Sequence, residues 1–375
     1  MHSVYILDYK VKTSQGDTKQ TLKAIKDTDI DISYKEVSTL NESVKIPYYL
    51  FEEKSSESVS AIKKIIKDIV IQIAKTLSDE QKADTVLFVG TSLVDTHLVE
   101  AVESTVYDYK KKPYTSAKKS IDSFACEISD ELGLHPYTMT ISTACTSSMN
   151  ALLEAKNLIG SGVVKHAIVI GVEVFSQMMS DGFSSMKLLS GSIQKPFDIS
   201  RDGLVLGEAV AGVLLGSDTS EWSLLGGYSN CNSLNITSVS PQGDEYAEVI
   251  NRAMELCNVK TDDITAIKAH ATSTLTNDLS EINAIKKVFS PDVVFTTLKP
   301  YVGHTLGACG VLELAMLISC IDDGFIPKTI NHEKSIIDEY VPLLNHKPCE
   351  DGTFMLNYFG FGGNNTSVLV KKEIR

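Results

Sequence analysis

Short, almost wholly apolar runs alternate along this chain with longer amphipathic stretches, and this alternation restricts the possible folds more than any other feature. Residues 85–90 (TVLFVG) and 166–174 (HAIVIGVEV) are apolar at nearly every position, as expected for strands buried on both faces of a sheet. Residues 57–77 instead repeat isoleucine at helical spacing. Strands that alternate with helices in this way predict an α/β protein with largely parallel sheets.

The predicted order of elements begins again near residue 217, which suggests two halves of similar architecture. In the first half we expect strands at 3–9, 85–90, 138–144, 166–174 and 204–216, with helices at 57–77, 120–132 and 146–160. In the second half we expect strands at 222–230, 264–269, 293–297, 353–358 and 366–371, with helices at 244–257, 277–289 and 306–322. The glycine-containing run 204–216 is expected to be an antiparallel strand near a sheet edge. No low-complexity linker divides the halves, so we expect one compact body with a site between them.

The charge balance argues against several classes of function. The formal net charge is −13, whereas nucleic acids and membrane surfaces both attract a basic face. Short lysine runs at 110–112 and 118–119 are the exceptions, and we interpret them as solvated surface. No apolar run reaches the roughly 20 residues that span a bilayer, and no signal peptide is visible. Cysteines without CxxC spacing predict reduced thiols, and we expect a cytoplasmic protein.

Cys145 stands where a predicted strand passes through small residues into a predicted helix. The unpaired N–H groups and the dipole at a helix N-terminus lower the pKa of a thiol and favour the thiolate. Ala144, Ser147 and Ser148 leave room beside it for a ligand. A buried cysteine that only packs is the alternative, and its position alone does not exclude this.

Two further segments place imidazoles at strand ends, where α/β proteins bind ligands. His270 ends one predicted strand and is followed by Thr272 and Thr274, whose hydroxyls could bind a ligand or cap the next helix. His304 lies between Lys299 and Glu313 in a glycine-rich junction, where the three could form a charge network.

The turn at 359–363 (FGFGG) combines three glycines with two bulky rings, and its backbone N–H groups could form an oxyanion hole. A tight hairpin packed by its aromatic rings is the alternative. Taken together, the segments supply a nucleophile, two imidazoles, a cation and an amide-rich turn. That set of groups is suited to thioester chemistry.

These segments resemble the β-ketoacyl-acyl-carrier-protein synthases of the Cys-His-His type, members of the thiolase superfamily. The motifs occur in the family's order over roughly residues 85–371: Thr143–Cys145 (TAC), Pro196–Glu208 (PFDISRDGLVLGE), His270–Thr274 (HATST), Lys299–Glu313 and Phe359–Gly363 (FGFGG). The resemblance implies a thiolase fold, a five-layered α-β-α-β-α body of two pseudo-duplicated halves. Residues 1–216 would carry the nucleophile, and residues 217–375 the histidines and the lysine.

The resemblance also implies an activity, a decarboxylating Claisen condensation that yields a β-ketoacyl carrier protein. Cys145 would accept an acyl group from an acyl carrier protein. His270 and His304 would hold the thioester carbonyl of malonyl carrier protein and promote its decarboxylation. Lys299, supported by Glu313, would organise the electrostatics around His304.

The remaining implied roles concern the oxyanion, the substrate arm and the partners. Backbone N–H groups of Cys145 and Phe361 would form the oxyanion hole, and the Phe361 ring would gate the acyl site. Thr272 and Thr274 would contact the phosphopantetheine arm. The resemblance implies no metal and no cofactor of the enzyme's own. It implies pairing with a second copy or with a related ketosynthase-like subunit.

Several positions depart from the family pattern. Ala271 and Ala209 stand where glycine is usual, Ser148 replaces a common glycine, and Asn364 replaces a threonine. The glycine-rich N-terminal opening is missing, and the stretch from Gly90 to Cys145 is short. These departures favour a divergent synthase of a secondary lipid, aryl polyene or polyketide pathway over housekeeping fatty-acid elongation.

Three other functions are weighed against this one, because a fold alone does not fix function. A chain-length-factor-like partner subunit usually lacks the nucleophile, whereas Cys145 is present here. A thiolase or initiating synthase of the Cys-His-Asn type would have asparagine at the position of His304. A binding protein on the same scaffold has no sequence feature in its favour.

Overall fold

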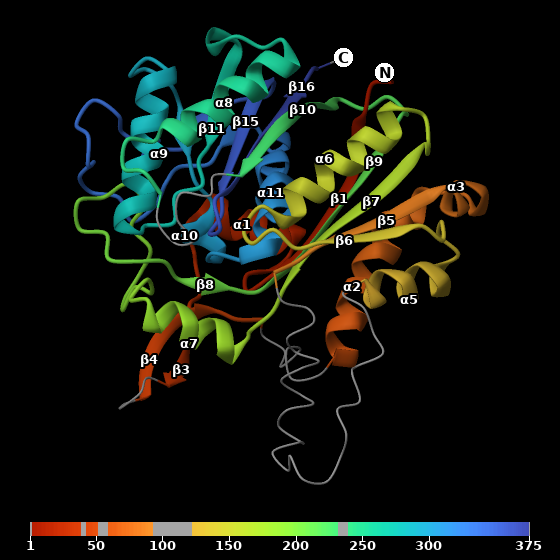
Figure 1. The fold of residues 1–375 in the computed structure, drawn as a ribbon, viewed down its shortest axis with the longest axis horizontal. Coiled ribbons are helices and arrows are strands. Elements are labelled where there is room, and N and C mark those ends of the chain that lie inside the picture. The colour runs from red at the N-terminus through yellow and green to blue at the C-terminus, as the bar shows by residue number, and fades with distance from the viewer. Residues whose placement is uncertain (1, 39–42, 52–58, 93–121, 232–238, 375) are drawn as a thin grey trace.

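The computed structural model describes the chain except for residues 1, 39–42, 52–58, 93–121, 232–238 and 375 (Figure 1). The lysine runs at 110–112 and 118–119 therefore lie outside the described residues, as does the start of the helix expected at 120–132. The other expected elements are found with small shifts at their ends.

The first half of the chain forms five strands of one large sheet. They are β1 (Tyr5–Thr13), β5 (Thr85–Gly90), β6 (Thr138–Ile141), β7 (His166–Glu173) and β9 (Ala209–Gly216). Their order is β6-β5-β7-β9-β1, with β6, β5 and β7 parallel and β9 antiparallel to both of its neighbours. The edge position expected for 204–216 is therefore wrong. β9 is an interior strand because the N-terminal strand β1 pairs along its outer side.

The second half repeats this arrangement. Its strands are β10 (Trp222–Cys231), β11 (Ile264–Lys268), β12 (Phe295–Thr296), β15 (Gly352–Phe359) and β16 (Asn364–Lys372). Their order, β12-β11-β15-β16-β10, has the same sequence of parallel and antiparallel pairs as the first half. The sheets are mixed, not largely parallel, because β7–β9 and β15–β16 run antiparallel. A short antiparallel pairing of β1 with β10 joins the two sets of strands.

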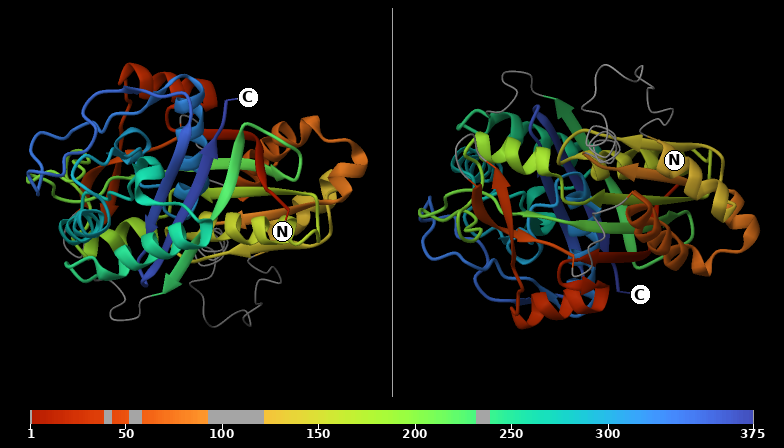
Figure 2. Two further views of the ribbon diagram at one scale, coloured as in Figure 1. Left: turned by 90° about the horizontal axis from the view of Figure 1, so that it is seen from above. Right: turned by 90° about the horizontal axis from the view of Figure 1, so that it is seen from below.

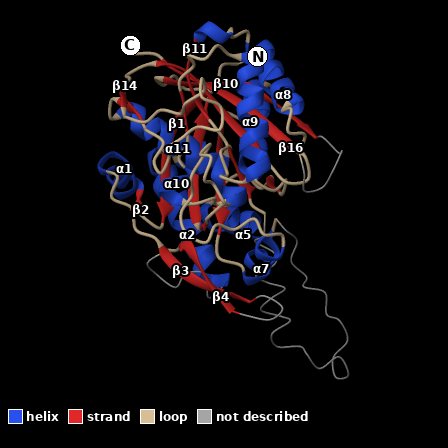
Figure 3. Ribbon diagram, turned by 90° about the vertical axis from the view of Figure 1, so that its left-hand side faces the viewer, coloured by secondary structure: helices blue, strands red, loops and turns tan. Residues whose placement is uncertain are grey.

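Helices separate and cover the strands in five layers, as expected for this fold class (Figures 1 and 3). The middle layer holds α6 (Ser147–Gly160) and α11 (Cys309–Asp322), which contact each other. The outer layer of the first half holds α2 (Val59–Ile73) and α5 (Ser123–Leu132), and that of the second half holds α8 (Asp244–Cys257) and α9 (Leu275–Val288). Helix α11 is buried along almost its whole length, which agrees with its mostly apolar sequence; its buried charge, Glu313, has ion-pair partners.

The remaining elements are short and lie around this body. They are β2 (Gly16–Asp17), α1 (Thr18–Asp27), β3 (Ser33–Ser38), β4 (Ser43–Tyr49), α3 (Asp79–Ala83), α7 (Gln177–Ser185), β8 (Leu206–Gly207), α10 (Lys299–Val302), β13 (Phe325–Ile326) and β14 (Lys347–Pro348). Strands β3, β4 and β8 form a small separate sheet. Figure 2 shows the two halves from above and below, with the green strand β10 between the blue strands of the second half and the strands of the first.

Candidate active site

The predicted nucleophile lies in a tight turn between β6 and α6. Ala144 has a φ of 54°, the left-handed conformation that reverses the chain just before Cys145. The hydroxyl of Ser147 fixes this turn, because it donates to the carbonyl of Ala144 (2.6 Å) and accepts from the N–H of Thr143 (2.9 Å). Cys145 is only 3% exposed, at the start of α6.

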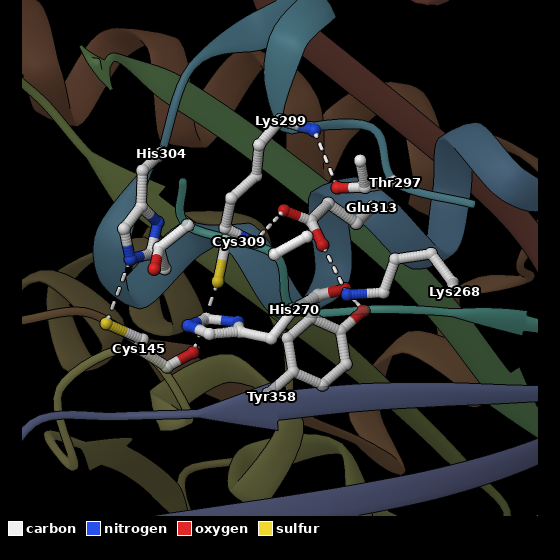
Figure 4. Close-up of polar contacts among 12 residues, drawn as sticks. Cys145, Lys268, His270, Thr297, Lys299, His304, Cys309, Glu313 and Tyr358 are labelled. Atoms are coloured by element: carbon white, nitrogen blue, oxygen red, sulfur yellow. Dashed lines mark hydrogen bonds and ion pairs between the residues drawn. The ribbon is translucent and has the colours of Figure 1, made fainter. Parts of the chain in front are cut away.

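Both predicted histidines meet Cys145, although they come from the other half of the chain (Figure 4). The Sγ atom of Cys145 lies 3.1 Å from Nε2 of His304. The rings of His270 and His304 are 5.3 Å apart and nearly perpendicular. Ligand atoms of the three side chains all lie within 4.8 Å of one another, and among the described residues this is the one cluster of metal-ligand type. The sequence motifs therefore converge in space.

Backbone contacts fix each imidazole. The N–H of His304 donates to the carbonyl of Val205 (2.7 Å), and its carbonyl accepts from Gly207 (3.2 Å). At His270 the carboxylate of Glu281 accepts two backbone N–H groups, from His270 (2.6 Å) and Ala271 (2.7 Å). Burial raises the pKa of this carboxyl group to about 7, and these two hydrogen bonds oppose the shift.

The departure at Ala271 has a clear structural meaning. Its φ is 49°, so this alanine adopts the left-handed conformation that glycine reaches without strain. The contact with Glu281 supports that conformation. The backbone after His270 therefore keeps its turn without the glycine that is usual there.

The charge network expected at Lys299 and Glu313 is present and larger than expected. Nζ of Lys299 lies 2.6 Å from one oxygen of Glu313, and Lys268 binds the other oxygen. All three side chains are 0–1% exposed. Sequence reasoning missed Lys268, which ends β11 two residues before His270. Its place on an apolar strand was the available signal, because a lysine there must be buried with a partner.

The FGFGG turn closes the site from the opposite side. A side chain at Gly360 would come within 3.3 Å of the backbone nitrogen of Cys145, so glycine permits this close approach. The N–H groups of Phe361 and Cys145 both lower the pKa of the Cys145 thiol, which means that both are directed at the sulfur. The Phe361 ring packs against Phe183 of α7, with 5.7 Å between ring centroids.

Burial dominates the protonation of the three central groups. It raises the pKa of Cys145 to about 12, although Lys299 acts in the opposite direction. The expectation that the helix N-terminus gives Cys145 a lowered pKa is therefore wrong for the free protein. Burial, with Lys299 next in size, also holds the pKa of His270 and of His304 well below the usual range. The resting site thus has a neutral thiol beside two neutral imidazoles.

A pocket leads to these groups past the predicted threonines. It is lined by Cys145, Leu188, Leu204, Val239, Tyr246, His270, Thr272, Thr274, Thr276, Asn277, His304, Phe359, Gly360 and Phe361. The hydroxyls of Thr272 and Thr274 lie 3.0 Å apart. Arg201, from the PFDISRDGLVLGE segment, donates to the carbonyls of Thr274 and Leu275 and so fixes this wall. Sequence reasoning missed Tyr246, whose ring stacks on Phe359 at 3.6 Å.

Ser148 is packed tightly where α6 meets α11. Its hydroxyl accepts the N–H of Val311 at 3.2 Å, which links the starts of the two central helices. If Gly90, Gly171 or Gly310 carried a Cβ atom, that atom would lie 2.3, 3.2 or 2.6 Å, respectively, from the nearest atom of Ser148. The serine that replaces a glycine thus fills a space formed by other glycines.

The last two departures lie in strands. Ala209 opens β9 and is fully buried between β1 and β7. The carbonyl of Asn364 accepts the N–H of Gly360 (2.7 Å) and closes the turn. This bond uses the backbone of residue 364 and does not require a threonine side chain.

A further buried carboxylate, Glu173, binds the backbone three residues after His304 and was also missed from the sequence. Glu173, at the end of β7, accepts the N–H of Gly307 (2.9 Å) and both the N–H and the hydroxyl of Ser92. Burial raises its pKa to about 7.

In the described part of the chain, no helix has the length and apolar character needed to cross a membrane.

Comparisons with known proteins agree with this geometry. The family model for the β-ketoacyl synthase N-terminal domain matches residues 59–220, and that for the C-terminal domain matches residues 223–333. The chloroplastic 3-oxoacyl-[acyl-carrier-protein] synthase I of Arabidopsis thaliana is 34% identical over 64% of this chain and 54% of its own length. The 3-oxoacyl-[acyl-carrier-protein] synthase 2 of Vibrio harveyi is 28% identical over 79% of this chain and 77% of its own length. The chain thus spans about half of the first relative and about three quarters of the second.

A solved structure shows the same fold over the whole chain. The ketosynthase ApeO in complex with its chain length factor ApeC, from Xenorhabdus doucetiae, aligns with a TM-score of 0.82 at 24% identity. The alignment covers 99% of this chain and 98% of the other. Because both family models match in order and together cover more than half of the sequence, the chain belongs to the β-ketoacyl synthase family.

Proposed function

We propose that this chain catalyses the decarboxylating condensation of an acyl group on Cys145 with malonyl carrier protein. The observation that carries the proposal is the convergence of a thiol and two neutral imidazoles within 4.8 Å at the end of a pocket. A chain-length-factor-like role is not favoured, because nothing in such a role requires this convergence.

The first step transfers an acyl group from its carrier to the enzyme. His304, 3.1 Å from the sulfur, accepts the thiol proton as Sγ of Cys145 attacks the acyl thioester carbonyl. A new carbon–sulfur bond forms, and the bond to the carrier's sulfur breaks. The departing carrier thiolate takes the proton from His304, which leaves both histidines neutral for the next step.

The second step releases carbon dioxide from malonyl carrier protein. Both ring nitrogens of His270 lack hydrogen-bond partners, as does Nδ1 of His304. Neutral imidazoles can donate an N–H to the malonyl thioester oxygen, where negative charge grows. The bond to the malonyl carboxylate breaks, carbon dioxide leaves, and the electron pair remains as an enolate.

The third step forms the new carbon–carbon bond. The enolate carbon attacks the thioester on Cys145, and the N–H groups of Cys145 and Phe361 stabilise the resulting oxyanion. When this tetrahedral intermediate collapses, the bond to Sγ of Cys145 breaks and the β-ketoacyl carrier protein is released. The thiolate that remains takes up one proton from solvent. Lys299, which Glu313 holds in place, stabilises these anionic stages through its positive charge, and no metal or other cofactor is part of the scheme.

The proposal extends to substrates and partners. Thr272 and Thr274 line the pocket and supply hydroxyls for the amides of a phosphopantetheine arm. The substrates would arrive on an acyl carrier protein, in the cytoplasm. The chain would pair with itself or with a related ketosynthase-like subunit. The departures at Ser148 and Ala271 support a secondary lipid, aryl polyene or polyketide pathway.

The proposed halves are 1–216 and 217–375. The repeated strand order supports a boundary at this place, because β9 ends the first set of strands at Gly216 and β10 opens the second at Trp222.

The test of this function is acyl loading followed by release of carbon dioxide. Wild-type protein incubated with a panel of acyl carrier proteins should gain the mass of one acyl group, and Cys145→Ala should gain none while keeping its circular dichroism spectrum. Cys126→Ala is the matched control, because Cys126 is an exposed cysteine outside the pocket. Acylation of the Cys145→Ala protein would contradict the proposal.

A further inference from the structure

Lys268 shares the carboxylate of Glu313 with Lys299, yet none of the steps above uses it. Glu313 gives one oxygen to each lysine, and all three side chains are 0–1% exposed. One carboxylate therefore binds two ammonium groups, and these three side chains together carry one net positive charge. The buried Glu281 also interacts with Lys268, but burial raises the pKa of its carboxyl group to about 7 and it makes no ion pair with this lysine. Burying only a neutral pair of Lys299 and Glu313 would cost less free energy than burying this cluster, because an unmatched charge loses its hydration without full compensation.

The other contacts of Lys268 stabilise its charge without neutralising it. Its Nζ donates to the carbonyl of Asn357 (3.0 Å) and lies 3.7 Å from the centroid of the Tyr358 ring. A carbonyl dipole and an aromatic face both attract a cation, but neither carries a negative charge. The fold therefore keeps a surplus cation at this place (Figure 4).

The surplus charge lies close to the reacting groups. The Tyr358 ring is 6.4 Å from the His270 ring, so Nζ of Lys268 is within about 10 Å of that imidazole. After burial and Lys299, Lys268 is among the causes that lower the pKa of His270 and of His304. Its field therefore reaches both imidazoles.

We propose that Lys268 is a positioning residue for the condensation: by occupying one oxygen of Glu313, it leaves the cluster of Lys268, Lys299 and Glu313 with one net positive charge, which stabilises the enolate and the Cys145 thiolate. This inference rests on the proposed function. A purely structural lysine would be needed for stability alone, whereas a surplus cation serves the reaction at the expense of stability. The two roles therefore predict opposite changes when the charge is removed.

The experiment compares Lys268→Met with a matched control, Lys372→Met. Lys372 is also buried (8% exposed), pairs with a carboxylate (Asp322, 2.8 Å) and lies near an aromatic ring (Trp222, 5.8 Å), but unlike Lys268 it is not among the charges that lower the pKa of His270 and His304. Lys268→Met should lower the rate of carbon dioxide release roughly ten-fold, as expected for a unit charge about 10 Å away at an effective dielectric constant of about 20. The KM for malonyl carrier protein should change little.

The pH profile and the melting temperature separate electrostatics from structure. Removal of a cation raises the pKa of the imidazoles, so the acid limb of the rate profile should move up by about one pH unit in Lys268→Met. The melting temperature should stay the same or rise, because a neutral ion pair remains. Lys268→Arg, which keeps the charge, should restore the wild-type acid limb.

Two results would overturn the inference. In the first, the Lys268→Met protein keeps the wild-type rate and the wild-type acid limb. In the second, the Lys268→Met protein melts at a lower temperature and has fewer active sites, but its pH profile is unchanged. If the wild type releases no carbon dioxide, the proposed function fails instead. In that case the rate of Cys145 alkylation by iodoacetamide against pH still tests Lys268, and the Lys268→Met curve should lie at higher pH.

Discussion

Replacement of Glu313 by glutamine should expose how strongly the buried charge cluster depends on one carboxylate. The change keeps the shape of the side chain but leaves Lys268 and Lys299 without a negative partner, in surroundings where both are fully buried. Breaking a buried ion pair by removing one partner costs about 3–5 kcal/mol. We expect the free energy of unfolding of Glu313→Gln to fall by at least this amount near pH 7.

The loss should depend on pH in a defined direction. Burial, the largest cause, already lowers the pKa of Lys268 to about 8, and Glu313 opposes that shift. Without the carboxylate the folded pKa falls further, whereas an unfolded lysine titrates near 10.4. Between the folded and unfolded values the unfolded chain binds more protons, so stability rises with pH. In the wild type the free energy of unfolding rises with pH for this reason only above about pH 8, the folded pKa of Lys268. In the variant the rise begins at lower pH, so the difference in unfolding free energy between variant and wild type should shrink between about pH 6.5 and 8.5.

Urea denaturation at these two pH values measures both effects. Glu255→Gln is the control, because Glu255 forms an exposed ion pair with Arg252 and should contribute less than about 1 kcal/mol. The reasoning would be refuted by a Glu313→Gln protein that loses less than about 1 kcal/mol near pH 7, or whose deficit is the same at both pH values.

Three other predictions follow from the site. His304→Ala should reduce carbon dioxide release from malonyl carrier protein by about 10²-fold or more, because one donor to the developing enolate is lost, and release at the wild-type rate would contradict its role. Ala271→Gly should leave stability unchanged or raise it by up to about 1 kcal/mol in urea denaturation, since it removes left-handed strain from an alanine with φ of 49°; a clear loss would show that the methyl group packs usefully. Carrier-protein binding should weaken as salt increases, because we expect the carrier protein to dock on a local lysine patch despite the net charge of −13; affinity that is indifferent to salt would exclude electrostatic docking.

Local patterns predicted most elements and the thiol, the two imidazoles, Lys299 and Glu313 of the site, but not Lys268. The motifs around Cys145 and His270 identify strand ends, where α/β proteins place ligands. These two ends belong to β6 and β11, in different halves of the chain, so their meeting followed from the family resemblance and not from strand pairing. The spacing of Lys299 and Glu313 around one glycine-rich junction predicted their charge network, and the two side chains form an ion pair. Residue types and their spacing identified these groups, whereas their individual roles were implied by the family resemblance.

What the sequence could not predict depends on contacts between distant segments. The run 209–216 is interior because β1, about 200 residues earlier, pairs with it, and no local pattern records that partner. The pKa of Cys145 was misjudged because the local turn suggests an exposed helix end, whereas the second half of the chain buries it. Lys268 was overlooked because its partner Glu313 lies 45 residues away on another element.

The close packing around Ser148 has a consequence for the evolution of substrate range. Gly90, Gly171 and Gly310 leave no space for another atom beside Ser148, so the start of α6 and the sulfur that it carries cannot shift to suit a bulkier acyl group. Variation must therefore be absorbed elsewhere, in the turn that holds Phe361 or in the wall that holds Thr272. Libraries aimed at new acyl donors should keep the three glycines fixed and diversify those two segments, since a mutation at any of the glycines would move the nucleophile before it changed the choice of substrate.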